Sequence, residues 1–208
     1  MPDFAAIAKA LETGRSDELL ALVQAALGAG ATAQAILNEG LFPGMDAVGR
    51  LFREGEYFLP EVLLSARTMN RALAVLEPLL VGQQAARSEK VVLATVKGDM
   101  HDIGKTIVAI LIRGAGFEVV DLGVDVPTET IVSAVREHQP VAVGLSALLT
   151  TTMLAMPDVI AALEQAGLRS QVKVLIGGAA VTEKYAAQIG ADGYSDDAYG
   201  AVSILRGR

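Results

Sequence analysis

The stretch "KVVLATVKGDMHDIGKTIVAIL", residues 90–111, sets the fold of the C-terminal half of this 208-residue chain. Its first seven residues form a short apolar run of strand length, and a helical stretch begins at Ile103. The loop between them holds His101, one of only two histidines in the chain, between Asp99 and Asp102. The stretch therefore predicts a strand, a loop and a helix in succession, with a histidine in the loop that needs a partner for each ring nitrogen.

Similar apolar runs recur at regular intervals after this first one. Strand-length runs lie at 117–122, 141–146 and 172–178, with a weak fifth near 193–194. Helical stretches lie at 103–114, 128–138, 152–166 and 181–189, with a last one from about residue 197. Strands that alternate with helices are typical of parallel βαβ units. We therefore predict an α/β domain with a doubly wound, flavodoxin-like or Rossmann-like parallel sheet of five strands in the order 2-1-3-4-5.

The N-terminal part of the chain has a different periodicity. Thr32 is a predicted helix cap, Pro43 and its neighbouring glycines are expected to bend the helix that follows, and Pro60 suits the first turn of another helix. Four helices with short turns predict an up-and-down bundle. The polar segment 82–89 is the expected linker, so that the bundle occupies 1–86 and the α/β domain 87–208.

The composition excludes several classes of function. The chain is 52% hydrophobic and 20% charged, as expected of a globular protein. Its net charge of −7, without a dense basic run, argues against a nucleic-acid partner. No apolar stretch reaches the roughly 18–20 residues of a membrane span, and no signal sequence is visible, so a cytoplasmic location is expected. Without cysteine there are no disulfides or thiolate nucleophiles, and a zinc site is not expected.

In an open parallel sheet, ligands bind beyond the carboxyl ends of the strands, where the strand order reverses. For the order 2-1-3-4-5 this point lies between the first and third strands. His101, Ser146, Gly177 and Gly178 are expected to meet there, and the paired glycines let a ligand come close to the backbone.

Three motifs appear in this half in a fixed order: D-x-H-x-x-G, then S-x-L, then G-G. Their residues are Asp99, His101, Gly104, Ser146, Leu148, Gly177 and Gly178. The set resembles the cobalamin-binding signature of corrinoid proteins, which hold vitamin B12 with its own base displaced. In addition, "GLFPGMDAVGRLFREGEYFLPEVLLSARTM", residues 40–69, is similar to the cap domain of methionine synthase and of corrinoid proteins that serve methylamine, methanol or methoxyarene methyltransferases. The two likenesses together cover about residues 32–202.

The resemblance implies a role for individual residues. His101 would be the lower axial ligand of cobalt, Asp99 would bond its other ring nitrogen, and Ser146 would complete a ligand relay. The corrin and the entrance for its tail would be bordered by Gly98, Met100, Asp102, Ile103 and Gly104. The slot for the displaced nucleotide tail would be lined by Ser146, Leu148, Thr150, Gly177, Gly178 and Ala198. The upper face of the cobalt would be covered by Phe52, Leu59 and Val62. Asn38 aligns near a glutamate of methionine synthase, and its role is left open.

The same resemblance implies a methyl carrier of one-carbon metabolism that has no catalytic activity of its own. Its cofactor would be cobalamin, cycling between Co(I) and methylcobalamin. A substrate:corrinoid methyltransferase would load the methyl group, and a methylcorrinoid:acceptor methyltransferase would pass it to tetrahydrofolate or coenzyme M. A reductive activase would be a third partner. The sequence does not indicate the methyl donor, nor the oligomeric state.

Two other B12 functions and several structural interpretations remain as alternatives. An adenosylcobalamin-dependent regulator or light sensor usually has a tryptophan over the cobalt and a DNA-binding module, and this chain has no tryptophan. The cobalamin subunit of a mutase usually lacks the helical cap.

The cap residues Phe52, Leu59 and Val62 are alternatively core residues of the bundle. Asp121 and Asp125 are interpreted as loop caps, and contact of their loop with the side-chain amides of the cofactor is the alternative. His138 is interpreted as a solvated residue at a helix end.

Overall fold

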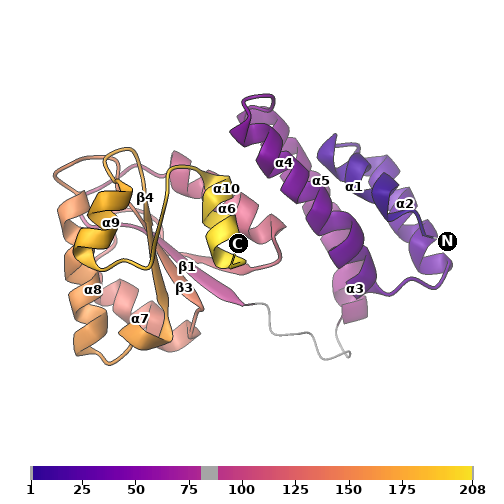
Figure 1. The fold of residues 1–208 in the computed structure, drawn as a ribbon. Coiled ribbons are helices and arrows are strands. Elements are labelled where there is room, and N and C mark those ends of the chain that lie inside the picture. Colours follow the sequence, from indigo (N-terminus) through magenta and orange to yellow (C-terminus); the bar gives the residue numbers. More distant parts are fainter. Residues whose placement is uncertain (1, 81–88, 208) are drawn as a thin grey trace. The chain divides into compact units, whose positions relative to one another are not determined.

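A computed structural model describes residues 2–80 and 89–207, and the chain divides into two compact units (Figure 1). The main part of the first is Met1–Ser88, and the second consists of Glu89–Arg113 and Phe117–Arg208. The predicted boundary between residues 86 and 87, and the predicted linker up to residue 88, lie outside the described residues. None of the described helices is long and apolar enough to cross a lipid bilayer.

The second unit is a parallel sheet of five strands in the order β2-β1-β3-β4-β5, which confirms the predicted topology. The strands are β1 (Lys90–Thr95), β2 (Glu118–Asp121), β3 (Ala142–Ser146), β4 (Lys173–Gly177) and β5 (Gly193–Ser195). The central strands are almost wholly buried, since helices cover both faces of the sheet. The sheet order therefore places the reversal between β1 and β3, where the sequence predicts the ligand site.

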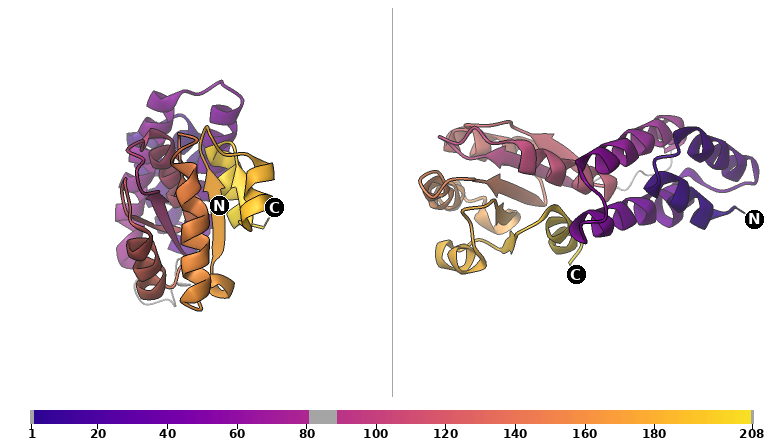
Figure 2. Two further views of the ribbon diagram at one scale, coloured as in Figure 1. Left: turned by 90° about the vertical axis from the view of Figure 1, so that its left-hand side faces the viewer. Right: turned by 90° about the horizontal axis from the view of Figure 1, so that it is seen from above.

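The helices of this unit form two layers, with α6 and α10 on one face and α7, α8 and α9 on the other (Figures 1 and 2). They are α6 (Ile103–Gly114), α7 (Thr128–His138), α8 (Met156–Gln165), α9 (Glu183–Ile189) and α10 (Ala198–Leu205). Short 3₁₀ turns, η2 (Met153–Ala155) and η3 (Arg169–Gln171), flank α8. The predicted helix over 152–166 therefore begins later than expected, with Pro157 in its first turn.

The first unit is helical, as predicted. Its helices are α1 (Phe4–Glu12), α2 (Ser16–Gly28), α3 (Ala33–Ala35), α4 (Phe42–Arg53) and α5 (Leu59–Leu80), with a π-helical segment, η1 (Ile36–Leu41), between α3 and α4. The predicted cap at Thr32 is present, because its hydroxyl accepts a hydrogen bond from the backbone of Ala35. The wide η1 turn comes directly before Pro43, which cannot continue the hydrogen-bond ladder.

Close backbone packing holds α1 against α4. A Cβ atom on Gly44 would lie 2.8 Å from the carbonyl oxygen of Ala8, so no side chain fits there.

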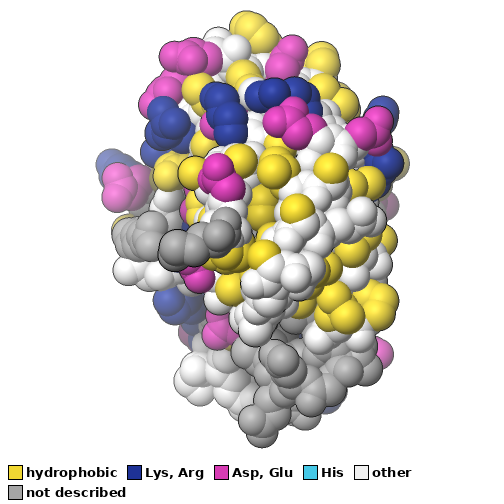
Figure 3. Space-filling view, turned by 90° about the vertical axis from the view of Figure 1, so that its right-hand side faces the viewer, with side chains coloured by type: hydrophobic (Ala, Val, Ile, Leu, Met, Phe, Trp, Pro, Cys, Tyr) yellow, Lys and Arg dark blue, Asp and Glu magenta, His cyan; other side chains and the backbone are white. Residues whose placement is uncertain are grey.

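The surface shown in Figure 3 has acidic and basic side chains mixed toward one end, with apolar side chains scattered over the rest. Exposed ion pairs of this unit, such as Arg15–Glu18 at 2.9 Å, contribute little stability because water screens them.

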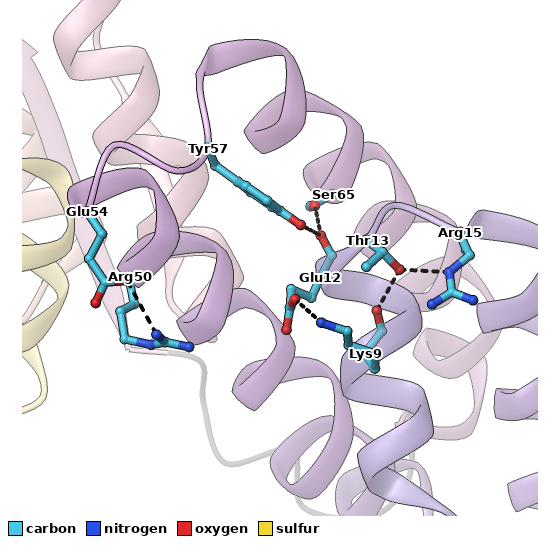
Figure 4. Close-up of polar contacts among 8 residues, drawn as sticks. All are labelled: Lys9, Glu12, Thr13, Arg15, Arg50, Glu54, Tyr57 and Ser65. Carbon is cyan, nitrogen blue, oxygen red and sulfur yellow. Dashed lines mark hydrogen bonds and ion pairs between the residues drawn. The ribbon is translucent and has the colours of Figure 1, made fainter.

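Hydroxyl groups from two segments bind the C-terminal end of α1 (Figure 4). The Tyr57 hydroxyl and the Ser65 hydroxyl both donate to the carbonyl oxygen of Glu12, over 3.2 and 3.0 Å. This carbonyl belongs to the last turn of a helix, which has no partner within the helix itself. The Tyr57 bond therefore fixes the segment before α5, which carries the exposed Phe58, to the end of α1, and the Ser65 bond fixes α5 itself to the same point.

Candidate functional site

Three loops of the second unit leave the same edge of the sheet. The register pairs Thr95 of β1 with Ser146 of β3, and Ser146 with Gly177 of β4. The pairing continues one residue further, because the Val96 N–H donates to the carbonyl oxygen of Ser146 over 3.1 Å. The loops that follow β1, β3 and β4 therefore start side by side, as expected for the ligand-binding edge of such a sheet.

His101 is held by Asp99 at the centre of this edge. Nδ1 of the His101 ring lies 2.7 Å from Oδ1 of Asp99, and the backbone N–H of His101 donates to the same oxygen over 3.0 Å. The Asp99 side chain is fully buried, whereas 51% of the His101 side chain is exposed. An ionised carboxylate only accepts hydrogen bonds, so Nδ1 donates in this contact, and in a neutral ring the lone pair is then on Nε2. This is the tautomer in which a histidine binds a metal through Nε2.

The second carboxylate oxygen of Asp99 is bound by the segment that follows β3. The backbone N–H of Leu148 donates to Oδ2 over 2.8 Å, and the Thr152 hydroxyl donates to it over 2.5 Å. Burial by itself raises the pKa of Asp99, but the hydrogen bonds from Thr152, from both backbone N–H groups and from the His101 ring together lower it by more. The pKa of Asp99 therefore lies well below its ordinary value, and the group is an anion at neutral pH.

Further hydrogen bonds fix the backbone of the histidine loop. The Thr95 hydroxyl donates to the carbonyl oxygen of His101 over 2.9 Å. Oδ1 of Asp125, on the loop after β2, accepts a hydrogen bond from the Gly98 N–H over 2.7 Å, and the Asp125 N–H donates to the carbonyl oxygen of Asp99 over 2.9 Å. The loop is thus tied to the end of its own strand, β1, and to the loop after the neighbouring strand β2.

The surroundings of His101 suit a large, partly apolar ligand. Met100 and Ile103 are 68% and 70% exposed, and Leu148 is 40% exposed. Such side chains rarely lie at a surface together unless they contact something. An exposed Nε2 lone pair beside apolar side chains fits a metal complex with a flat organic ring, as a corrinoid is, better than it fits a bare ion.

The paired glycines after β4 are required by the backbone. Gly178 has φ of +118°, and a Cβ atom there would lie 2.0 Å from the carbonyl oxygen of Ala147. At Gly177 a Cβ atom would lie 3.0 Å from the carbonyl oxygen of Ser195. Both positions therefore need glycine because the backbones that end β3, β4 and β5 approach each other closely there, and the tail slot at this edge stays a prediction.

The structure brings some of the predicted residues together and not others. Asp99, His101 and the Leu148 backbone form one hydrogen-bonded cluster. Asp102, Gly104 and Thr150 are exposed, and the side chain of Ala198 is buried at the start of α10. Ser146 is half-buried, and its hydroxyl makes no hydrogen bond to any residue that the structure describes. Its place in a relay stays a prediction, since Thr152 makes the hydroxyl contact with Asp99.

The predicted cap residues all lie in the first unit. Phe52, near the end of α4, is half-buried, Leu59 is 36% exposed, and Val62 is fully buried. Phe58 is the most exposed large apolar residue of this group, at 66%, and the sequence motif does not select it. Asn38 lies exposed in η1, where its side-chain oxygen accepts a hydrogen bond from Gln34. The contact of the cap residues with a cofactor stays a prediction.

The motif also misses Thr152 and Asp125. Thr152 is the last of three consecutive threonines after β3, and only the fold shows that its hydroxyl points to Asp99. Asp125 has φ of +50°, an uncommon conformation that aspartate adopts more readily than most residues. The sequence analysis interprets Asp125 only as a loop cap, from its place in the loop between a strand and a helix, two residues after Gly123.

Comparisons with known proteins agree with this geometry. A family model described as a B12 binding domain matches residues 89–203, and a second model with the same description matches residues 4–77. The trimethylamine corrinoid protein of Methanosarcina barkeri is 44% identical over 205 residues, covering 96% of this chain and 94% of that protein. Dimethylamine corrinoid protein 1 of Methanosarcina acetivorans is 42% identical, covering 95% and 92%. The methanol:cobalamin methyltransferase complex of Methanosarcina barkeri contains a similar chain, with a TM-score of 0.85, 36% identity, and coverage of 98% and 78%.

Proposed function

Because this chain belongs to the family of B12-binding corrinoid proteins, we propose that it is the methyl carrier of a corrinoid-dependent methyltransferase system. The observation that carries the proposal is the Asp99–His101 pair, in which Nδ1 is bound to a buried carboxylate and Nε2 faces outward. A bound corrinoid supplies a cobalt atom that accepts a methyl group and later releases it. The chain itself supplies the axial imidazole and the surfaces around it.

Each part of the site has a distinct task in this proposal. Asp99 fixes the ring tautomer and makes the imidazole a stronger ligand, because its negative charge compensates the charge that the ring gains on binding metal. The corrin edge is bordered by exposed Met100 and Ile103, which exclude water from the region around Nε2. The nucleotide tail, whose base His101 would displace, is assigned to the strand ends around Gly177 and Gly178, where the sequence motif implies its slot.

The helical unit is proposed to shield the other face of the corrinoid. Phe52 and Leu59 have exposed surface for this task. Val62 is fully buried in the structure. An apolar cover limits access of water and oxygen to a reduced metal. Such a cover must move aside for each partner enzyme, so the helical unit is expected to change position during the cycle.

The partners in this proposal are a substrate:corrinoid methyltransferase and a second methyltransferase that transfers the group to tetrahydrofolate or coenzyme M. A reductive activase is expected to restore the reduced cofactor. The relatives' names cite trimethylamine, dimethylamine and methanol, although their chains resemble this one to a similar degree. We therefore place the choice of methyl donor in the partner enzyme. To test whether the partner enzyme determines the methyl donor, the carrier is paired with a methyltransferase for each donor, and the consumption of that donor is measured.

Reconstitution tests the proposed function directly. The protein is incubated anaerobically with methylcobalamin, desalted, and its absorption spectrum is recorded. We expect retained corrinoid with the spectrum of a histidine-ligated cobalt (His-on). His101→Ala should retain some corrinoid through the tail slot but show the spectrum without a protein ligand (His-off).

His138→Ala is the matched control, because it removes the only other histidine of the chain, which lies at the end of α7. It should behave like the wild type. A wild-type protein that is colourless after desalting would overturn the proposed function. An unchanged spectrum in His101→Ala would remove His101 from the ligand role.

A further inference from the structure

We propose that Tyr57 is a positioning residue for the apolar cover, because its hydroxyl fixes the turn that joins α4 to α5. The turn consists of residues 54–58. Phe52 lies just before the turn and Leu59 directly after it, so its course sets how these two side chains of the proposed cover lie relative to each other. The inference rests on the proposed function, in which the helical unit shields the bound corrinoid.

The backbone of the turn is hydrogen-bonded to the two helices that it joins. The N–H groups of Glu56 and Tyr57 both donate to the carbonyl oxygen of Leu51 in α4, over 3.0 and 3.1 Å. At the other end, the Phe58 N–H donates to the side chain of Glu61 in α5 over 2.9 Å. Backbone hydrogen bonds of exposed segments open easily. The turn therefore needs a further attachment if it is to keep one conformation.

The Tyr57 side chain provides such an attachment to a distant part of the chain. Tyr57 is half-buried, whereas the other residues from 53 to 60 are exposed. Its hydroxyl donates over 3.2 Å to the carbonyl oxygen of Glu12, which lies 45 positions earlier in the chain. Figure 4 shows the side chain reaching from the turn to the end of α1. Because the next residue, Phe58, is 66% exposed, burial of its own side chain contributes little to holding the turn.

Ser65 binds the same carbonyl oxygen from a different place. Its hydroxyl donates to the Glu12 carbonyl over 3.0 Å from within α5, where Ser65 is only 1% exposed. The Ser65 bond therefore attaches the helix, and the Tyr57 bond attaches the turn before it. A carbonyl oxygen has two lone pairs, so removing either hydroxyl leaves the Glu12 carbonyl with one partner. The two side chains thus form a matched pair that differs in what each of them holds.

Amide hydrogen exchange in the corrinoid-free protein, followed by NMR, tests whether Tyr57 fixes the turn. Tyr57→Phe removes the hydroxyl and keeps the aromatic ring. We expect the amides of residues 56–58 to exchange about three- to tenfold faster than in the wild type, as the loss of one hydrogen bond predicts. Ser65→Ala is the matched control and should leave the exchange of these three amides at the wild-type rate, even where it lowers the stability of the whole protein.

A second measurement tests whether the turn matters for the cover. The protein is loaded with cobalamin, reduced and mixed with aerated buffer, and absorbance follows the oxidation of the corrinoid. Tyr57→Phe should oxidise several-fold faster than the wild type, because a loosened turn lets Phe52 and Leu59 move apart and admits water and oxygen. Ser65→Ala should oxidise at the wild-type rate. A merely structural role would affect both variants alike, since each loses one hydroxyl bond to Glu12.

The outcomes separate this inference from the proposed function. A wild-type protein that is colourless after desalting overturns the proposed function and this inference with it. A wild type that retains corrinoid, together with wild-type exchange or wild-type oxidation in Tyr57→Phe, overturns the inference alone. Equal effects in Tyr57→Phe and Ser65→Ala also overturn it, because the end of α1 is then weakened as a whole. If Tyr57→Phe does not fold, Tyr57→Met is measured in its place by both methods.

Discussion

Asp125 and Asp99 lie on loops that follow neighbouring strands, and the backbone N–H of Asp125 donates to the carbonyl oxygen of Asp99 over 2.9 Å. The Asp125 side chain also accepts a hydrogen bond from the Gly98 N–H, one residue before Asp99. The loop that presents the histidine is thus held at its backbone from one side by the end of β2. The carboxylate of Asp99 is held from the other side by the segment after β3.

Replacing Asp125 is expected to loosen the histidine loop. Asp125→Ala removes the acceptor for Gly98 and puts alanine at φ of +50°, which together should cost about 1–2 kcal/mol of unfolding free energy. Asp125→Asn retains an acceptor and tolerates the same backbone conformation, so it should lose less than half as much. Urea unfolding of the corrinoid-free protein measures both values. Equal losses in the two variants would contradict this account of Asp125.

Gly178 should tolerate no side chain. Alanine there combines a φ of +118° with a Cβ atom 2.0 Å from the carbonyl oxygen of Ala147, so we expect a loss of about 3 kcal/mol or more in stability. Gly28→Ala is the control, because Gly28 ends α2 and a Cβ atom there meets nothing within 4 Å. Thermal unfolding should show a clear decrease for the first variant and no decrease for the second. A Gly178→Ala protein as stable as the wild type would show that β3 and β4 can separate at this edge.

The low pKa of Asp99 predicts how stability depends on pH. In the unfolded chain the carboxyl group takes up its proton near the ordinary value of 3.8, and in the folded chain only at lower pH. Asp99 therefore contributes its full stabilisation above about pH 4, and this contribution is lost as the pH falls further toward the folded-state pKa. Asp99→Asn should be less stable than the wild type by roughly 2–3 kcal/mol at neutral pH. The amide replaces one accepting oxygen with an NH2 group, which can only donate, in a site where the surrounding groups are themselves donors.

The difference between Asp99→Asn and the wild type should shrink as the pH falls below about 4. Urea unfolding of the corrinoid-free proteins, from neutral pH down to the lowest pH at which they stay folded, measures this difference in stability. Asp102→Asn, at an exposed neighbouring aspartate, is the control and should follow the wild type throughout. A difference that stays constant below pH 4 would show that the charge of Asp99 is not the source of its contribution.

The proposed cover predicts a change in sensitivity to air. Phe52→Ala should speed the oxidation of the bound, reduced corrinoid several-fold, because water and oxygen reach the metal more easily. Leu79→Ala is the control, since Leu79 is an exposed apolar residue near the opposite end of α5 from Leu59. Stopped-flow absorbance after mixing with aerated buffer gives both rates. If Phe52→Ala and the wild type oxidise equally fast, Phe52 is a core residue of the bundle only.

Most of the α/β fold could be predicted from the sequence, because apolar runs and their spacing determine it. The helices Ile103–Gly114 and Thr128–His138 begin and end where the periodicity places them, and the strand order follows from alternating strands and helices. The π-helical turn at Ile36–Leu41 could not be predicted in detail. Gly40, within this turn, packs closely on Ile7 of α1, and a local sequence pattern does not contain such a long-range contact.

In the cluster around His101, too, the sequence predicts the local contact but not the long-range one. The D-x-H spacing predicts the contact of Asp99 with the ring, since both residues lie in one short loop. The partner of the second carboxylate oxygen depends on how the segment after β3 turns, over a sequence distance of 53 residues. Ser146 and Thr152 have the same hydroxyl chemistry, and only the three-dimensional course of the chain distinguishes them.

The groups that hold Asp99 and His101 come from the protein alone, so the imidazole has its orientation before any cofactor arrives. If His101 binds cobalt as proposed, the ring would lose little conformational entropy when the bond forms, and binding would be stronger for that reason.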